Sequence, residues 1–246
     1  MRPTARGALP REGGCGIIRP VLPPPMPSRP NKVLNSPAIR RMPLYLHWLL
    51  GMRGLGKKTV STTELADCMK LGWIVVRKDI ALTGVSGRPR VGYDVDRLVA
   101  AIRAFLGWKE ARRAALVGAG ALGSAILGYG EFANCGLDVA LVFDSDPEKA
   151  GRRIRGRTVR PISELPEAFR REPPEIAILC VPAAAAQETA DLLGRNGVRY
   201  LWNCADVALE VPRDVIVQRE SIAAGLAMLS VKIRNDRSGR RSRIED

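Results

Sequence analysis

A glycine-rich segment at residues 118–123 holds the residues whose spacing most clearly predicts chemistry in this 246-residue chain. It consists of Gly118, Ala119, Gly120, Ala121, Leu122 and Gly123. A short apolar run, Ala114–Val117, precedes it, and a stretch with helical periodicity follows. In this order the first glycine allows a tight turn, the second lets a pyrophosphate approach the backbone, and the third permits close packing of helix on strand. The segment therefore predicts a site for an adenine dinucleotide, with the N–H groups of the new helix facing the phosphates.

A carboxylate follows the next predicted strand, Val139–Phe143. At this position Asp144 would accept hydrogen bonds from the adenosine ribose hydroxyls and would repel a 2′-phosphate, which favours NAD(H) over NADP(H). Two alternatives stay open for this residue. Asp146 shares the ribose role, or Asp144 is a surface acid at the end of a strand.

Residues suited to catalysis are not arranged for it. A dehydrogenase needs a proton donor or acceptor beside the nicotinamide, yet the single histidine, His47, lies far from the glycine segment in the sequence. Cys180 and Cys204 end two predicted strands and could face the cofactor, but neither has a basic partner and both are better explained as small strand residues. The five cysteines form no C-x-x-C pair, so we expect reduced thiols and no metal site. We expect a protein that is not an enzyme; an NAD-dependent oxidoreductase is the alternative.

The formal net charge of +14 is concentrated in one part of the chain. Residues 32–113 hold 16 basic and 6 acidic side chains, a net charge of +10, whereas residues 114–231 carry a net charge of −3. Such a density of positive charge in an ordered segment indicates double-stranded DNA or another nucleic acid as a partner. Basic side chains that serve only solubility are the alternative. No apolar run reaches the roughly 18–20 residues of a membrane-spanning helix, and we expect a cytoplasmic protein.

The pattern of residues predicts an α/β protein in which an N-terminal winged-helix domain precedes a Rossmann-type, doubly wound parallel sheet. Helices are expected at 38–52, at 73–82 and at 95–106, and a further helix is expected to begin at a capping box formed by Ser61–Glu64. A β-hairpin wing is expected at 83–93. Strands at 114–117, 139–143, 176–181, 200–203 and 215–217 alternate with helices at 122–133, 162–171, 185–196 and 221–231. The expected divisions are a disordered basic tail (1–36), a DNA-binding domain (37–112), a nucleotide-binding domain (113–220), a C-terminal helix (221–232) and a second disordered basic tail (233–246).

From about residue 39 to residue 232 the chain resembles the bacterial redox-sensing transcriptional repressor Rex family. The most specific matching segments are Arg77–Asp79, Val91–Val95, Gly118–Gly123, Phe143–Lys149 and Val181–Gln187. The resemblance implies a homodimer that binds a palindromic operator. NADH would release the protein from this DNA, whereas NAD+ would permit or favour repression. It also implies that the C-terminal helix is exchanged between subunits.

The resemblance assigns roles to individual residues as well. Tyr129 and Pro182 join the glycine segment and Asp144 as cofactor-binding residues. The expected DNA contacts are Arg77, Lys78, Arg88 and Arg90. The first two belong to the recognition helix and the other two to the wing. For each arginine a solvated surface charge is the alternative, and Asp79 is expected to cap or pair rather than to touch DNA.

The chain departs from the family at three places. The recognition helix opens with Trp73 and Ile74, whose apolar side chains cannot make bidentate hydrogen bonds to bases and would instead contact thymine methyl groups or a neighbour. His47 and Ser221 stand where relatives often carry an arginine and an aspartate that form a charged switch with the tyrosine at Tyr129. We expect Tyr129 and Ser221 still to pair and the coupling between NADH and DNA to be weaker; a coupling that runs through Glu220 instead is the alternative. A divergent paralogue that has lost redox sensing or specific DNA binding is a further alternative.

Overall fold

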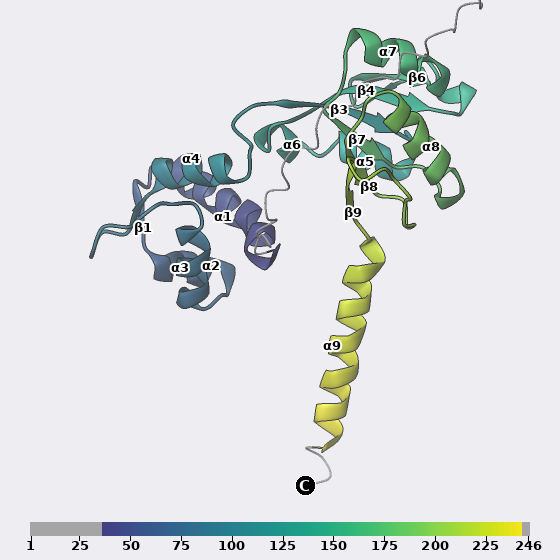
Figure 1. The fold of residues 1–246 in the computed structure, drawn as a ribbon. Coiled ribbons are helices and arrows are strands. Elements are labelled where there is room, and N and C mark those ends of the chain that lie inside the picture. Colours follow the sequence, from purple (N-terminus) through teal and green to yellow (C-terminus); the bar gives the residue numbers. More distant parts are fainter. Residues whose placement is uncertain (1–35, 243–246) are drawn as a thin grey trace, which may run out of the picture.

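The computed structural model describes residues 36–242, in which a helical N-terminal part leads into a mostly parallel sheet and a long final helix (Figure 1). This confirms the predicted α/β class. The tail expected to be disordered at residues 1–36 lies outside the described residues, apart from Ser36. In the described part no helix is long and apolar enough to cross a membrane, and no group of acidic, histidine and cysteine side chains could hold a metal ion.

The N-terminal part is built from short helices and a two-stranded antiparallel sheet. Its elements are α1 (Ser36–Gly54), β1 (Thr59–Val60), α2 (Thr62–Met69), α3 (Trp73–Ala81), β2 (Tyr93–Asp94) and α4 (Val95–Phe105). Ser61 caps α2 as predicted, since its hydroxyl accepts from the N–H of Glu64 at 3.1 Å. A capping box would also direct the Glu64 carboxylate back to the Ser61 N–H, and this part of the prediction is wrong. The Glu64 carboxylate pairs with Lys57 instead, because a lysine cation offers it a charge-assisted hydrogen bond.

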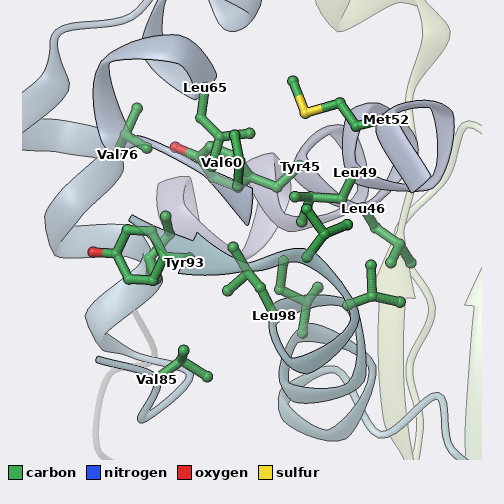
Figure 2. Close-up of a cluster of buried hydrophobic side chains, with 14 of the residues drawn as sticks. Tyr45, Leu46, Leu49, Met52, Val60, Leu65, Val76, Val85, Tyr93 and Leu98 are labelled. Carbon is green, nitrogen blue, oxygen red and sulfur yellow. The ribbon is translucent and has the colours of Figure 1, made fainter. Parts of the chain in front are cut away.

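One hydrophobic core holds these helices together (Figure 2). Figure 2 shows Tyr45 and Leu49 of α1 lying near Val60 of β1, Leu65 of α2 and Leu98 of α4. On α4 the buried side chains fall at the i, i+3, i+4 and i+7 spacing of one helical face, from Val95 to Ile102. Burying each such side chain contributes about 1.5–3 kcal/mol, so the core fixes the orientation of α3 relative to α1.

The wing is shorter than the β-hairpin predicted at residues 83–93. A single antiparallel bridge joins Arg88 and Gly92, whose N–H and C=O groups exchange hydrogen bonds of 2.8 and 2.9 Å. Pro89 has no N–H to extend a ladder, and from Tyr93 the chain pairs with β1 instead. Gly92 adopts φ +91°, and a side chain there would collide with the Val60 carbonyl. The hairpin prediction is therefore wrong in its extent, and the loop is a tight turn anchored at its base.

A seven-stranded sheet forms the second part of the chain in the order β5-β6-β4-β3-β7-β8-β9. The strands are β3 (Arg112–Val117), β4 (Leu137–Asp144), β5 (Arg153–Ile154), β6 (Arg157–Pro161), β7 (Ile176–Leu179), β8 (Tyr200–Asn203) and β9 (Ile216–Arg219). All neighbouring pairs except β5–β6 are parallel. The chain proceeds outward from β3 in one direction and then, from β7, in the other. Such a reversal places a ligand crevice at the carboxyl ends of β3 and β7.

Helices cover both faces of the sheet, and a separate hydrophobic cluster lies under each face. These helices are α5 (Ala121–Leu127), α6 (Glu131–Asn134), α7 (Leu165–Arg171) and α8 (Ala183–Arg195), with 3₁₀ turns η1 (Pro147–Lys149) and η2 (Ile162–Glu164). The single helix expected at 122–133 is divided into α5 and α6, because Gly128 and Gly130 weaken the helix between them. The arginine-rich pair β5–β6 is absent from the prediction.

The last helix, α9 (Ile222–Ser242), projects away from the sheet (Figure 1). The helix is expected from the sequence to end near Lys232 and to be followed by a disordered tail. This prediction is wrong, because the helix continues to Ser242. Lys and Arg are strong helix formers, and positive charge toward the C-terminus of a helix is favourable for its dipole. Apolar side chains of α9, including Ile222, Leu226, Leu229 and Ile233, are 44–81% exposed. Their spacing of four, three and four residues places them along one stripe of the helix.

A buried carboxylate ties α3 to α1. Asp79, 3% exposed, receives two hydrogen bonds from the Arg41 guanidinium at 2.6 and 2.9 Å and one from the Tyr45 hydroxyl at 2.9 Å. Burial and the neighbouring Asp79 carboxylate raise the pKa of Tyr45, so its hydroxyl stays a donor. The expectation that Asp79 pairs within the protein is thus confirmed.

We expect Asp79→Ala to lower the free energy of unfolding by about 2–3 kcal/mol, because it strands a partly buried guanidinium and a buried hydroxyl. Tyr45→Phe, which removes one hydrogen bond, is expected to cost about 1 kcal/mol. Urea unfolding followed by circular dichroism measures both. The control is Asp67→Ala on the exposed side of α2, which should stay within about 0.5 kcal/mol of the parent. An equal loss in the control would contradict the assignment.

Candidate functional site

The glycine segment lies in the turn between β3 and α5, at the carboxyl end of the central strand. Gly118 adopts φ +100°, and an added Cβ would overlap the carbonyl group of Cys180, lying 2.6 Å from its carbon. A Cβ on Gly123 would collide with the Gly118 carbonyl oxygen. Both glycines are therefore required by the fold itself. The sequence argument for the tight turn and for close helix–strand packing agrees with this geometry.

Gly120 differs from the other two glycines of the segment. It is exposed, its φ of −78° is open to any residue, and no atom lies within 4 Å of an added Cβ. No side chain caps the first N–H groups of α5 at this position. The loop therefore presents bare backbone to the crevice, and this cradle fits a pyrophosphate that approaches the backbone closely. The residues present fit the dinucleotide that the sequence predicts.

Asp144, at the end of β4, supports the loop on one side, and β7 lies on the other side of β3. Its Oδ2 accepts from the Ala119 N–H at 2.7 Å and lies 3.1 Å from the Lys149 Nζ, while its Oδ1 accepts from the Asp146 N–H at 2.9 Å. The side chain is buried, whereas that of Asp146 is 41% exposed. The structure thus shows a positioning role for Asp144 that sequence reasoning missed. Asp146 is the more accessible of the two acids for a ribose.

The charge state of Asp144 follows from these contacts. Burial of the carboxylate opposes ionisation, but hydrogen bonds from the Asp146 N–H, from Lys149 and from the Ala119 N–H outweigh it and lower the pKa of Asp144. The same pairing raises the pKa of Lys149. The carboxylate is therefore ionised throughout the neutral range and holds Ala119, the second residue of the glycine segment, in place.

The two residues added by the resemblance flank helices of the sheet region. Tyr129 follows α5, is 56% exposed and makes an edge contact with Phe132 at a ring-centroid distance of 4.8 Å. Pro182 is exposed and immediately precedes α8, one residue after Val181. Ser221 is partly buried at the root of α9, and His47 is exposed on α1 beside Trp48. A Tyr129–Ser221 hydrogen bond is not seen within residues 36–242, so their pairing stays a prediction.

The exposed face of α3 carries the proposed DNA contacts. Val76, Asp79 and Ile80 point into the core, which leaves Arg77 and Lys78 exposed. One turn earlier, Trp73 and Ile74 are 53% and 51% exposed. Because residues four apart share a helical face, the two apolar and the two basic side chains form a single surface.

The wing adds further positive charge. Arg88 and Arg90 are exposed, with Arg90 at the tip of the turn in the left-handed region at φ +63°. Arg88 also lines a hollow of about 330 Å³ at the base of the wing, together with Arg97 of α4. Sequence reasoning missed Arg97, whose approach to the wing depends on the β1–β2 pairing. Two guanidinium groups beside one hollow suit a phosphate backbone.

Comparisons with known proteins identify the family. A family model described as “CoA binding domain” matches residues 109–207, and one described as “DNA-binding protein N-terminus” matches residues 35–81. The redox-sensing transcriptional repressor Rex of Treponema denticola is 41% identical over 200 residues, which cover 81% of this chain and 95% of that protein. The chain belongs to the Rex family. Rex of Brevibacillus brevis is 34% identical over 197 residues, covering 80% of this chain and 95% of the relative.

Solved Rex-family structures share the whole arrangement. RSP, a Rex-family repressor, has been solved in complex with β-NAD+ and operator DNA; it matches with a TM-score of 0.75 and 30% identity over 85% of this chain and 96% of that one. RSP in complex with β-NADH matches with a TM-score of 0.74 and 29% identity over 85% and 98% of the two chains. The Rex family thus unites the N-terminal DNA-binding part and the Rossmann-type part of the fold, as the sequence predicts.

The glycines allow a matched test of the loop. We expect Gly118→Ala to lower the free energy of unfolding by about 3 kcal/mol, because the methyl group meets backbone and the φ is unfavourable. Gly120→Ala should change it by no more than about 0.5 kcal/mol, yet weaken NADH binding at least about tenfold by filling the pyrophosphate approach. Urea unfolding and NADH titration by fluorescence give the two readouts. Unchanged NADH affinity in Gly120→Ala would refute the loop as the site.

Acidification tests the role of Asp144. Its folded pKa is lowered, so its contribution to stability is present above the unfolded value of about 3.9 and is lost as pH falls through the folded value. We expect Asp144→Asn to cost about 2 kcal/mol at neutral pH. This difference from the parent should stay constant down to about pH 5 and shrink below about pH 4, as measured by urea unfolding at each pH. A difference that grows on acidification would contradict the sign.

Proposed function

We propose that this chain is a transcriptional repressor that senses the NADH/NAD+ ratio, binds a palindromic operator as a homodimer and leaves it when NADH binds. One observation carries the proposal: the chain joins an exposed basic recognition helix to an open dinucleotide loop. The Rex-family relatives support it, because RSP has been solved with β-NAD+ and operator DNA and with β-NADH. We place the protein in the cytoplasm, where such a repressor meets both DNA and free NADH.

Residues 37–112 form the DNA-binding domain of this proposal. Arg77 and Lys78 enter or border the major groove, and Arg88 and Arg90 contact the backbone or minor groove. The pair Trp73 and Ile74 contacts thymine methyl groups, since neither side chain can make a bidentate hydrogen bond to a base edge. The operator of this protein therefore differs from that of relatives with a polar first turn.

Residues 113–220 form the nucleotide-binding domain. The loop from Gly118 to Gly123 receives the pyrophosphate, and Asp146 together with the remaining acceptor capacity of Asp144 receives the adenosine ribose. Tyr129 and Pro182 lie toward the nicotinamide. The bound dinucleotide supplies a signal, its redox state, rather than a hydride for a substrate.

The helix from Ser221 onward is exchanged between two subunits. Its support is the stripe of exposed apolar side chains from Ile222 to Ile233, which a second copy of the chain would cover. In this arrangement the swapped helix lies between the two domains, and Ser221 pairs with Tyr129 across the subunit boundary. The second candidate is a divergent paralogue within the family that has lost redox sensing, favoured by His47 and Ser221 at the positions where relatives often carry an arginine and an aspartate.

Electrophoretic mobility shifts on DNA upstream of fermentative genes, at fixed salt, test the function. We expect NADH to weaken operator binding about tenfold, a common size for coupling between two sites, while NAD+ at the same concentration leaves the complex in place. Coenzyme A serves as the competing ligand class and should have no effect. An operator affinity that neither NADH nor NAD+ changes would point to the second candidate. A shift near a hundredfold would contradict the weakened switch expected from Ser221.

Two variants separate the two halves of the proposal. Gly120→Ala should still bind the operator and lose the response to NADH. Arg77→Ala combined with Lys78→Ala should still bind NADH, lose the operator, and lower the salt slope of residual DNA binding by about one for each lost phosphate contact.

A further inference from the structure

Two cysteines lie side by side at the sheet edge that holds the nucleotide loop. Cys180 follows β7 and Cys204 follows β8, one position beyond the parallel pair Leu179↔Asn203. The Cys204 N–H donates to the Leu179 carbonyl at 2.9 Å, so the ladder continues to this point. Neighbouring strands run about 4.7–4.9 Å apart, and disulfides join Cα atoms about 4.4–6.8 Å apart. The backbone therefore places the two thiols within reach of a bond.

Both thiols also point to the same face of the sheet. They pack on the cluster that contains Ile178 and Trp202, their neighbours two positions earlier on each strand. Each cysteine is only partly buried, so a small oxidant can reach it. The other described free cysteines, Cys68 and Cys135, belong to α2 and to the turn after α6. Neither belongs to the pair, so both can be replaced when the pair is tested.

The environment gives the two sulfurs different roles. The Cys180 thiol hydrogen-bonds to Cys204 and lowers the pKa of Cys204, against the opposing effects of burial and of the Glu220 charge. The same interaction, together with burial, raises the pKa of Cys180. Of the two sulfurs, that of Cys204 ionises more readily, so its thiolate fraction attacks an oxidant and the Cys180 thiol resolves the product.

We propose that Cys180 and Cys204 form a reversible disulfide when the protein meets a hydroperoxide, and that this second redox input weakens NAD(H) binding at the adjacent loop. In the first step the Cys204 thiolate attacks a peroxide oxygen; an S–O bond forms, the O–O bond breaks and hydroxide leaves. Cys180 then attacks the Cys204 sulfur; an S–S bond forms, the S–O bond breaks, and water leaves with the Cys180 proton. Two thiols are oxidised and one hydrogen peroxide is reduced to two waters.

The link to the nucleotide loop is steric. The Cys180 carbonyl lies directly against Gly118, since a Cβ added to Gly118 would overlap it. A disulfide brings its two sulfurs to about 2.0 Å and requires a Cβ–S–S–Cβ dihedral near ±90°, so both side chains must turn to close the bond. A turn of Cys180 shifts the carbonyl on which the loop rests. This second part of the inference rests on the proposed function.

The first experiment tests the bond alone, in the full chain with Cys15→Ser, Cys68→Ser and Cys135→Ser. After stoichiometric hydrogen peroxide and alkylation, intact mass spectrometry should show loss of two hydrogens, reversed by dithiothreitol. With Cys180→Ser added, Cys204 should accumulate a sulfenic acid that dimedone traps; with Cys204→Ser instead, dimedone labelling should fall at least about tenfold, because the thiolate is gone. A chain that keeps both thiols under peroxide overturns the proposal.

The second experiment compares NADH affinity in the oxidised and the dithiothreitol-reduced forms of that chain. We expect oxidation to weaken NADH binding about tenfold, and Cys204→Ser to have the same affinity before and after peroxide. An oxidised form that binds NADH as the reduced form does would overturn the link to the loop. If the disulfide forms but even the reduced protein binds no NADH, it is the proposed function that fails, while the oxidisable pair stands.

Discussion

The close approach of the β3–α5 turn to the end of β7 is the constraint on which the nucleotide site depends. Gly118 rests against the Cys180 carbonyl on one side, while its N–H donates to the Phe143 carbonyl of β4 at 2.9 Å on the other. The next residue, Ala119, is held by the Asp144 carboxylate. The turn is thus clamped between the two strands that flank β3. A loop fixed in this way loses little conformational freedom when a ligand binds, so more of the contact energy appears as affinity.

Patterns that act locally could be predicted from the sequence. Strands of the sheet appear as short apolar runs such as Ile176–Leu179 because both of their faces are covered, and the α2 cap at Ser61 depends on residues only three apart. Predictions that needed competition between partners were wrong. The wing pairs with itself only at the Arg88–Gly92 bridge and from Tyr93 onward the chain pairs with β1, and Glu64 pairs with Lys57 rather than with a backbone N–H. Neither competitor, β1 or Lys57, belongs to the segment whose pattern made the prediction.

The candidate site divides along the same line. The glycine spacing indicates the loop because each glycine answers a requirement of the turn itself. The support from Asp144, the position of Arg97 beside the wing and the neighbourhood of Cys180 and Cys204 depend on strand order and on which elements pack together. The two cysteines are 24 residues apart in the sequence, and only the parallel register of β7 with β8 brings them opposite each other. Chemistry that arises from the sheet can be located only after the sheet is known.

Within the proposed function, the arrangement limits the path that a signal from the loop can take. The glycine turn, the cysteine pair and the root of α9 all lie at the carboxyl edge of the parallel strands, and the Glu220 N–H bonds to the Asn203 carbonyl beside Cys204 at 2.9 Å. From there α9 extends away from the sheet with its apolar stripe exposed in its own chain (Figure 1). A helix without apolar cover in its own chain cannot report a change at its root, since nothing packs against it in two alternative ways. Within the proposed function the cover comes from a second subunit, so the response of the recognition helix to the nucleotide is a property of the dimer rather than of the monomer.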